Sequence, residues 1–127
     1  MEKDNTELEI IMKAVVFYQD FELNANVFET KKIVVLFDKA IQIREFEEKE
    51  IKDFYTPDGV EGIDVKVNKQ EFCNAIYSIM NHLEVPVGHK DRPLFEKAGH
   101  TSMSIGDFVL FEDGEIWVVQ NMGWEIL

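Results

Sequence analysis

Cysteine and long apolar runs are both scarce in this chain of 127 residues. Cys73 is the only cysteine, which excludes an internal disulfide and is typical of a protein that folds in a reducing compartment. No apolar run approaches the roughly 18 residues of a membrane-spanning helix, and no apolar leader with a cleavage site opens the chain. We therefore expect a cytoplasmic protein that has no membrane partner.

Basic residues are also scarce, since 13 Lys and Arg stand against 25 Asp and Glu and the net charge is -12. The acidic excess lies at the two ends of the chain, because residues 1–30 hold seven acids and two bases, and residues 99–127 hold five acids and no base. Binding to nucleic acid phosphates requires clustered Lys and Arg. We therefore expect no direct nucleic acid binding. The acids act either as a solubilising surface or as a surface for a protein with a basic site.

The chain has the length of a single domain, 1–127, and its hydrophobic fraction of 46% argues against disorder. Residues 1–6 are polar, and we expect them to be frayed. No internal repeat or low-complexity tract divides the rest.

A β-hairpin is the clearest element near the C-terminus. The dipeptide Asp113-Gly114 is typical of a two-residue type I′ turn, and it separates two β-prone runs, 108–111 and 116–119. With this turn Phe111 faces Ile116, and both faces of the hairpin are apolar. Apolar residues on both faces predict a buried hairpin. The side chains expected in its core are Phe111, Trp117 and Val118.

The best helix spans residues 68–84. Asn68 and Glu71 have the spacing of a capping box, and apolar residues follow at helical intervals from Phe72 to Leu83. A shorter helix is expected at 45–55, after a strand that ends near Ile43. One further helical turn is expected at 94–97.

The remaining segments have extended patterns. Apolar and β-branched runs predict strands at 8–18 and 32–37, and alternation predicts a half-exposed strand at 63–67. Between the first two, 21–23 and 27–28 are expected to be extended around a turn at 24–26. The sequence thus predicts an α+β fold, an antiparallel or mixed sheet with the C-terminal β-hairpin packed on one main helix.

Neither a metal site nor a catalytic centre is expected. His82, His89, His100 and Cys73 are 7 to 11 residues from their neighbours in the chain, which fits no compact metal-ligand pair. No Gly-x-Ser-x-Gly turn activates a serine, and the glycines form no phosphate loop. We therefore expect no cofactor and no enzymatic activity.

The last 29 residues carry a recognisable pattern. Gly99-His-Thr-Ser-Met-Ser-Ile-Gly-Asp107 is followed by the hairpin and then by Gly123-Trp-Glu-Ile126. This stretch resembles the YodL-like family, small proteins of Gram-positive bacteria and their mobile elements with no established activity. The resemblance implies an origin in a mobile element or its host. The serines and threonine of the loop are also ordinary turn formers.

Two hypotheses for function follow. The first is a non-enzymatic module that binds a protein with a basic surface and interferes with a nucleic-acid-binding host protein. If the first strand and the hairpin are neighbours in the fold, this hypothesis predicts one negative surface that contains Asp20, Glu22, Glu112, Asp113 and Glu115. The alternative is a small-molecule-binding or hydrolytic domain that uses the loop at 100–107. Both hypotheses leave a homo-oligomer open. The candidate interaction residues are His100, Thr101, Ser102, Ser104, Asp107, Glu112, Asp113, Glu115 and Trp124.

Overall fold

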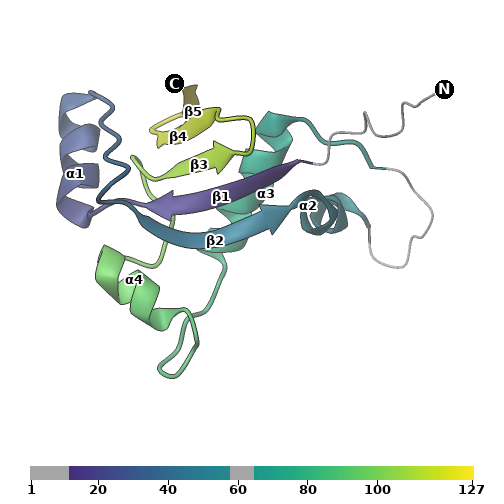
Figure 1. The fold of residues 1–127 in the computed structure, drawn as a ribbon, viewed down its shortest axis with the longest axis horizontal. Coiled ribbons are helices and arrows are strands. Elements are labelled where there is room, and N and C mark those ends of the chain that lie inside the picture. The colour runs from purple at the N-terminus through teal and green to yellow at the C-terminus, as the bar shows by residue number, and fades with distance from the viewer. Residues whose placement is uncertain (1–11, 58–64) are drawn as a thin grey trace.

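The protein has an α+β fold, as predicted, in a computed structural model that describes residues 12–57 and 65–127 (Figure 1). A five-stranded sheet has the order β2-β1-β3-β4-β5, and every neighbouring pair is antiparallel. The helix α3 crosses behind the sheet, and α1 stands at the end of the sheet where β1 ends. The elements in chain order are β1 (Lys13–Tyr18), α1 (Phe21–Thr30), β2 (Ile41–Glu47), α2 (Glu48–Tyr55), α3 (Lys69–Asn81), α4 (Arg92–Ala98), β3 (Phe108–Phe111), β4 (Ile116–Gln120) and β5 (Gly123–Ile126).

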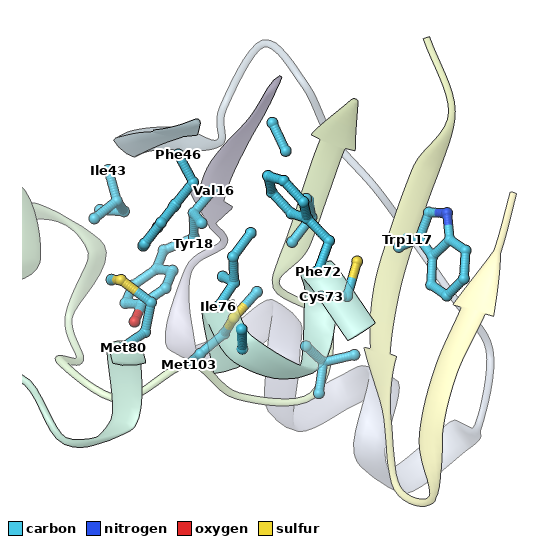
Figure 2. Close-up of a cluster of buried hydrophobic side chains, with 14 of the residues drawn as sticks. Val16, Tyr18, Ile43, Phe46, Phe72, Cys73, Ile76, Met80, Met103 and Trp117 are labelled. Carbon is cyan, nitrogen blue, oxygen red and sulfur yellow. The ribbon is translucent and has the colours of Figure 1, made fainter. Parts of the chain in front are cut away.

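The main core lies between α3 and one face of the sheet. Asn68 and Glu71 form the predicted capping box, with Asn68 Oδ1 accepting from Glu71 N at 2.8 Å and Glu71 Oε1 accepting from Asn68 N at 2.9 Å. The helix buries the apolar stripe that its spacing predicted, and it ends at Asn81, three residues earlier than expected. Figure 2 shows Met80 beside Tyr18 at one end of this core and Trp117 at the other. The buried side chains from α3 are Phe72, Cys73, Ala75, Ile76 and Met80.

The opposite face of the sheet is covered by the segment that follows α1. Phe17 and Phe108 stack at 5.0 Å between ring centroids, and the ring of Phe37 lies edge-on to both. The predicted strand at 32–37 is wrong, because this segment forms no strand. The buried Gln19 side chain holds it instead, with Nε2 donating to Val34 O at 2.9 Å and Oε1 accepting from Leu36 N at 2.9 Å.

The prediction of extended pieces at 21–23 and 27–28 is also wrong, because α1 spans both. The Asp20 side chain caps the helix by accepting from Glu22 N at 3.1 Å. Asn24 suggested a turn, but its side chain is buried and donates to Asp107 Oδ1 at 2.8 Å. A contact 83 residues away in sequence therefore overrides the local preference of the asparagine for a turn.

The C-terminal hairpin forms as β3 and β4, but its register differs from the prediction by one residue. Val109 pairs with Trp117, and Leu110 rather than Phe111 pairs with Ile116. The loop has three residues, and the last of them, Gly114, has a left-handed backbone with φ 95°. This is the usual form of a three-residue hairpin loop, whereas the prediction was a two-residue type I′ turn. A shift of one residue exchanges the faces of β4, so Trp117 joins Phe111 on the face toward α3. Phe111, Trp117 and Val118 are buried as predicted.

The other elements agree with the sequence to different degrees. The described part of the first predicted strand is β1. The change from strand to helix that was predicted near residue 45 appears as β2 followed by α2. The helical turn expected at 94–97 lies within α4. Residues 65–67 are not in a strand, and the rest of the strand expected at 63–67 lies outside the described residues, as do residues 1–6. Within the described ranges no helix could cross a membrane; the longest, α3, has 13 residues.

Candidate functional site

The loop from Gly99 to Asp107, which carries the family-like motif, joins α4 to β3 at the end of the sheet where α1 begins. Two of its glycines have a positive φ, 89° at Gly99 and 98° at Gly106. A Cβ atom on residue 106 would lie 2.2 Å from Asn24 Oδ1. Gly106 therefore meets both a conformational and a steric requirement for glycine.

Asp107 is the centre of this loop. Its side chain is fully buried, and its carboxylate accepts from Gln19 N, from Asn24 Nδ2 and from Ser104 N, each at 2.8 Å. These donors come from the end of β1, from α1 and from the loop itself. One carboxylate therefore joins its own loop to the end of β1 and to α1, whose donors lie 88 and 83 residues away in the sequence.

His100 completes the cluster. Its Nδ1 lies 2.8 Å from Ser102 O and its Nε2 lies 2.8 Å from Gln19 O. Because both partners are carbonyl oxygens, both contacts are hydrogen bonds only when each ring nitrogen carries a proton. Asp107 Oδ1 lies 3.7 Å from Nε2, and the His100 ring stacks on Tyr18 at 4.7 Å between centroids.

Burial dominates the electrostatics of this cluster. It raises the pKa of Asp107 to about 6, although His100 and the three N–H donors favour the charged form. Burial and the nearby Asp107 also raise the pKa of the Tyr18 hydroxyl above its usual range. That hydroxyl donates to Thr101 O at 2.9 Å, so it holds the loop against β1.

The hydroxyl-bearing residues of the loop, Thr101, Ser102 and Ser104, make contacts that stabilise the loop itself. Ser104 Oγ donates to Ser102 O at 3.1 Å, a bond within the loop of the kind expected of a turn former. Thr101 and Ser102 are exposed, and each contributes a backbone carbonyl to the contacts with Tyr18 and His100. In the described hydrogen bonds of this loop, both His100 nitrogens lie against backbone carbonyl oxygens and neither lies against a hydroxyl.

An apolar groove lies beside the cluster. It encloses about 260 Å³ between α1 and the loop. Phe21 and Phe28 of α1 are 63% and 50% exposed, although both are large apolar side chains. The residues that line it are Phe21, Asn24, Ala25, Phe28, Glu29, His100, Ser104 and Ile105.

Among the residues of this groove, His100 and Ser104 were predicted from the sequence, whereas Phe21, Ala25 and Phe28 were not. These three occur at i, i+4 and i+7, so they share one face of α1. The spacing was a usable signal, but assigning extended structure to 21–23 and 27–28 concealed it. Gln19, which is buried and ties the loop to the segment after α1, was also missed.

The acids of the hairpin lie at the other end of the sheet. Lys69 of α3 binds Asp113 Oδ2 at 2.5 Å and Glu115 Oε1 at 2.9 Å, and Glu112 is exposed beside them. Lys69 lowers the pKa of Asp113, and the Trp117 indole together with Lys69 lowers the pKa of Glu115. These two acids therefore act as partners of a basic residue of their own chain.

The prediction of a single acidic surface is wrong, because the strand directions separate the hairpin acids from Asp20 and Glu22. β1 and β3 are antiparallel, with Ala14 opposite Phe111 and Phe17 opposite Phe108. The hairpin tip therefore lies beside the start of β1, whereas Asp20 and Glu22 follow its end. The six residues of β1 separate the two groups by roughly 20 Å, about twice the screening length in physiological salt.

Trp124 belongs to β5, the edge strand next to β4. Its Nε1 donates to Asn74 Oδ1 at 2.9 Å, and its ring packs edge-on against Tyr77 at 6.3 Å between centroids. The indole of Trp124, a candidate interaction residue, therefore packs against α3. The side chain remains partly exposed beside a cleft.

No group of three potential metal ligands occurs among residues 12–57 and 65–127. Cys73 is buried in the core, where burial raises the pKa of its thiol. His82 ends α3 and contacts Ser78 O through Nδ1 at 2.7 Å, whereas His89 Nδ1 accepts from Asp91 N at 3.0 Å. The histidines therefore have separate local partners.

The fold and the site define an α+β protein in which a buried carboxylate–imidazole pair supports an exposed apolar groove. Comparisons of the chain with protein families, with curated proteins and with solved structures found no match. The resemblance of residues 99–127 to the YodL-like family therefore stays a prediction.

Proposed function

We propose that this protein is a non-enzymatic protein-binding module, and that the groove between α1 and the loop 99–107 is its binding surface. The observation that supports the proposal is the exposure of Phe21 and Phe28 on one helix face. Exposed apolar area costs about 25 cal/mol per Å², so a partner that covers both rings gains that free energy on binding. Contiguous exposed apolar groups of this kind mark interaction sites.

The charges around the groove indicate the chemistry of the partner. Asp20, Glu22 and Glu29 flank the apolar face of α1, whereas Lys31 lies over the Phe28 ring at the C-terminal end of the helix. A complementary segment therefore has apolar side chains for the groove and basic residues near the start of α1. Such charge complementarity raises the association rate and makes it sensitive to salt.

A finer proposal concerns the partner's identity. The net charge of -12 and the absence of any Lys or Arg in residues 99–127 favour a partner with a basic, nucleic-acid-binding surface over nucleic acid itself. Together with the resemblance described above, this composition supports a protein of a mobile element or its host that interferes with a nucleic-acid-binding host protein.

A variant with both Phe21→Ala and Phe28→Ala tests the groove. Both side chains are exposed, so the fold should persist, and Phe54→Ala is the matched control because Phe54 of α2 is 45% exposed away from the groove. Immobilised wild-type protein and the control should retain the same host proteins at 0.15 M salt, and the double variant should lose at least one of them. Equal capture by all three proteins would place binding elsewhere.

The alternative of a small-molecule site uses the same groove. His100 and Ser104 supply polar groups at an otherwise apolar wall, an arrangement found in ligand pockets. Its volume of about 260 Å³ lies slightly below the usual range of roughly 300–1,000 Å³ for such pockets. This alternative would be favoured if a small apolar probe bound saturably to the wild type and not to the double variant, and if the wild type captured no protein.

A further inference from the structure

We propose a second binding site, in which the Trp124 and Tyr77 rings receive the guanidinium group of an arginine from the protein partner. The site is the cleft of about 300 Å³ between α3 and the turn that joins β4 to β5. This second site depends on the proposed function in one respect only, namely that the arginine belongs to a protein partner. The residues that line the cleft are Asn74, Tyr77, Val119, Gln120, Asn121, Gly123 and Trp124.

The two aromatic rings form a fixed corner. Their planes meet at 83° with centroids 6.3 Å apart, and Tyr77 is 41% exposed. The hydrogen bond of 2.9 Å from Trp124 Nε1 to Asn74 Oδ1 fixes the indole orientation. The corner is therefore formed before a ligand arrives, which reduces the entropy lost on binding.

The electrostatics of the corner favour a cation. The faces of aromatic rings carry negative potential, and Trp gives the strongest interaction with cations. Cations of this chain already lie over three phenylalanine rings, Lys31 over Phe28, Arg44 over Phe46 and Lys69 over Phe111, at 4.3–5.0 Å from the ring centroids. Among the described residues that line the cleft none carries a charge, so no cation of this lining competes for the two rings. The net charge of -12 draws such a cation in.

The polar groups of the cleft favour guanidinium over ammonium. A guanidinium is planar and weakly hydrated, and it stacks on aromatic rings while its N–H groups donate hydrogen bonds. The side-chain amides of Asn74 and Asn121 line the cleft, and each has a neutral oxygen that can accept a hydrogen bond. A quaternary ammonium could use the rings but has no N–H group for these oxygens.

The topology places this cleft at the same end of the sheet as the apolar groove. β1 and β4 both pair with β3 in antiparallel fashion, so they run in the same direction. The groove follows the end of β1, and the cleft follows the end of β4. Val119 N also donates to Asp107 O at 2.9 Å, which joins the loop of the groove to the strand of the cleft. One partner can therefore reach both sites.

The test uses arginine without any partner. The full chain, labelled with ¹⁵N, is titrated at low salt with N-acetyl-arginine methylamide, with the matched citrulline compound, which is a neutral isostere, and with choline. The Trp124 indole N–H signal should shift and saturate with the arginine compound, with an affinity about tenfold above that of the citrulline compound, equivalent to about 1.4 kcal/mol. Equal affinity for both compounds would overturn the proposal, and tighter binding of choline would overturn the assignment of guanidinium.

Variants separate this site from the groove. Tyr77→Phe keeps the ring and should bind arginine within about twofold of wild type, whereas Tyr77→Leu should lose about tenfold because one cation–π face is removed. Asn74→Asp keeps an acceptor for Trp124 Nε1 and adds a negative charge, so it should bind arginine more tightly and citrulline no more tightly. Unchanged binding in Tyr77→Leu would refute the site. The Phe21→Ala and Phe28→Ala double variant should bind arginine normally, so failure of the groove and failure of the cleft give different results.

Discussion

Replacing Asp107 with alanine should destabilise the protein strongly, because this carboxylate is buried and has three N–H donors. The donors are Gln19 N, Asn24 Nδ2 and Ser104 N, each 2.8 Å from a carboxylate oxygen. Without the acceptor, the buried groups among them lose their hydrogen bonds, and His100 loses the carboxylate that lies 3.7 Å from its Nε2.

The magnitude follows from these lost contacts. Each buried donor left without a partner costs about 1–3 kcal/mol, and water that enters the space left by the side chain recovers part of this. We therefore expect the free energy of unfolding to fall by about 3–5 kcal/mol, a large part of the roughly 5–15 kcal/mol typical of a domain.

Urea unfolding at pH 7, followed by tryptophan fluorescence, measures the change. Asp113→Ala is the matched control, because Asp113 is exposed and paired with Lys69. It should cost about 1 kcal/mol or less, as exposed ion pairs do. A loss below about 1 kcal/mol for Asp107→Ala would refute the reasoning, since it would mean that the three donors are satisfied equally well without the carboxylate.

Three further predictions concern the same core and loop. Trp117→Ala should lower the free energy of unfolding by about 3–5 kcal/mol because Trp117 packs in the main core; a loss below about 1 kcal/mol in denaturant would contradict this. Gly106→Ala should lower the melting temperature by several degrees, because the alanine Cβ would meet Asn24 Oδ1 and the backbone there has a φ of 98°. Gly114→Asn is the control: Gly114 also has a positive φ but has open space around it, so this variant should change the melting temperature far less. The Asp107 carboxyl should titrate at about pH 6 in a ¹³C NMR experiment, and a pKa below 4 would show that its hydrogen bonds outweigh burial. Because this folded-state pKa lies above the unfolded value, ionisation of Asp107 should reduce the stability of the wild type, relative to Asp107→Asn, as the pH rises from about 4 to about 6.

Elements whose signals are local could be predicted from the sequence. The capping box at Asn68 and Glu71, with the apolar stripe after it, is contained within a few turns of helix, so α3 could be recognised without any partner. The apolar runs around Asp113-Gly114 likewise determined that a buried hairpin forms there. Together these elements were enough for the α+β class.

Elements whose hydrogen bonds join residues far apart in the chain could not be predicted from local sequence. Asn24 favours a turn by itself, and it lies in a helix because Asp107 accepts from its side chain. The segment at 32–37 has the composition of a strand, but the side chain of Gln19 takes the backbone groups of Val34 and Leu36 that strand pairing would use. In both places a buried side chain offered a better partner than the local one.

The candidate site shows the same division. The sequence singled out His100, Ser104 and Asp107 as a motif, but it could not show that Asp107 is buried or that His100 lies against Tyr18. The separation of the hairpin acids from Asp20 was also undecidable from charge counts, because it depends on strand direction. Local patterns determine which residues form a helix or a hairpin, whereas the placing of charges and grooves depends on contacts between residues far apart in the chain.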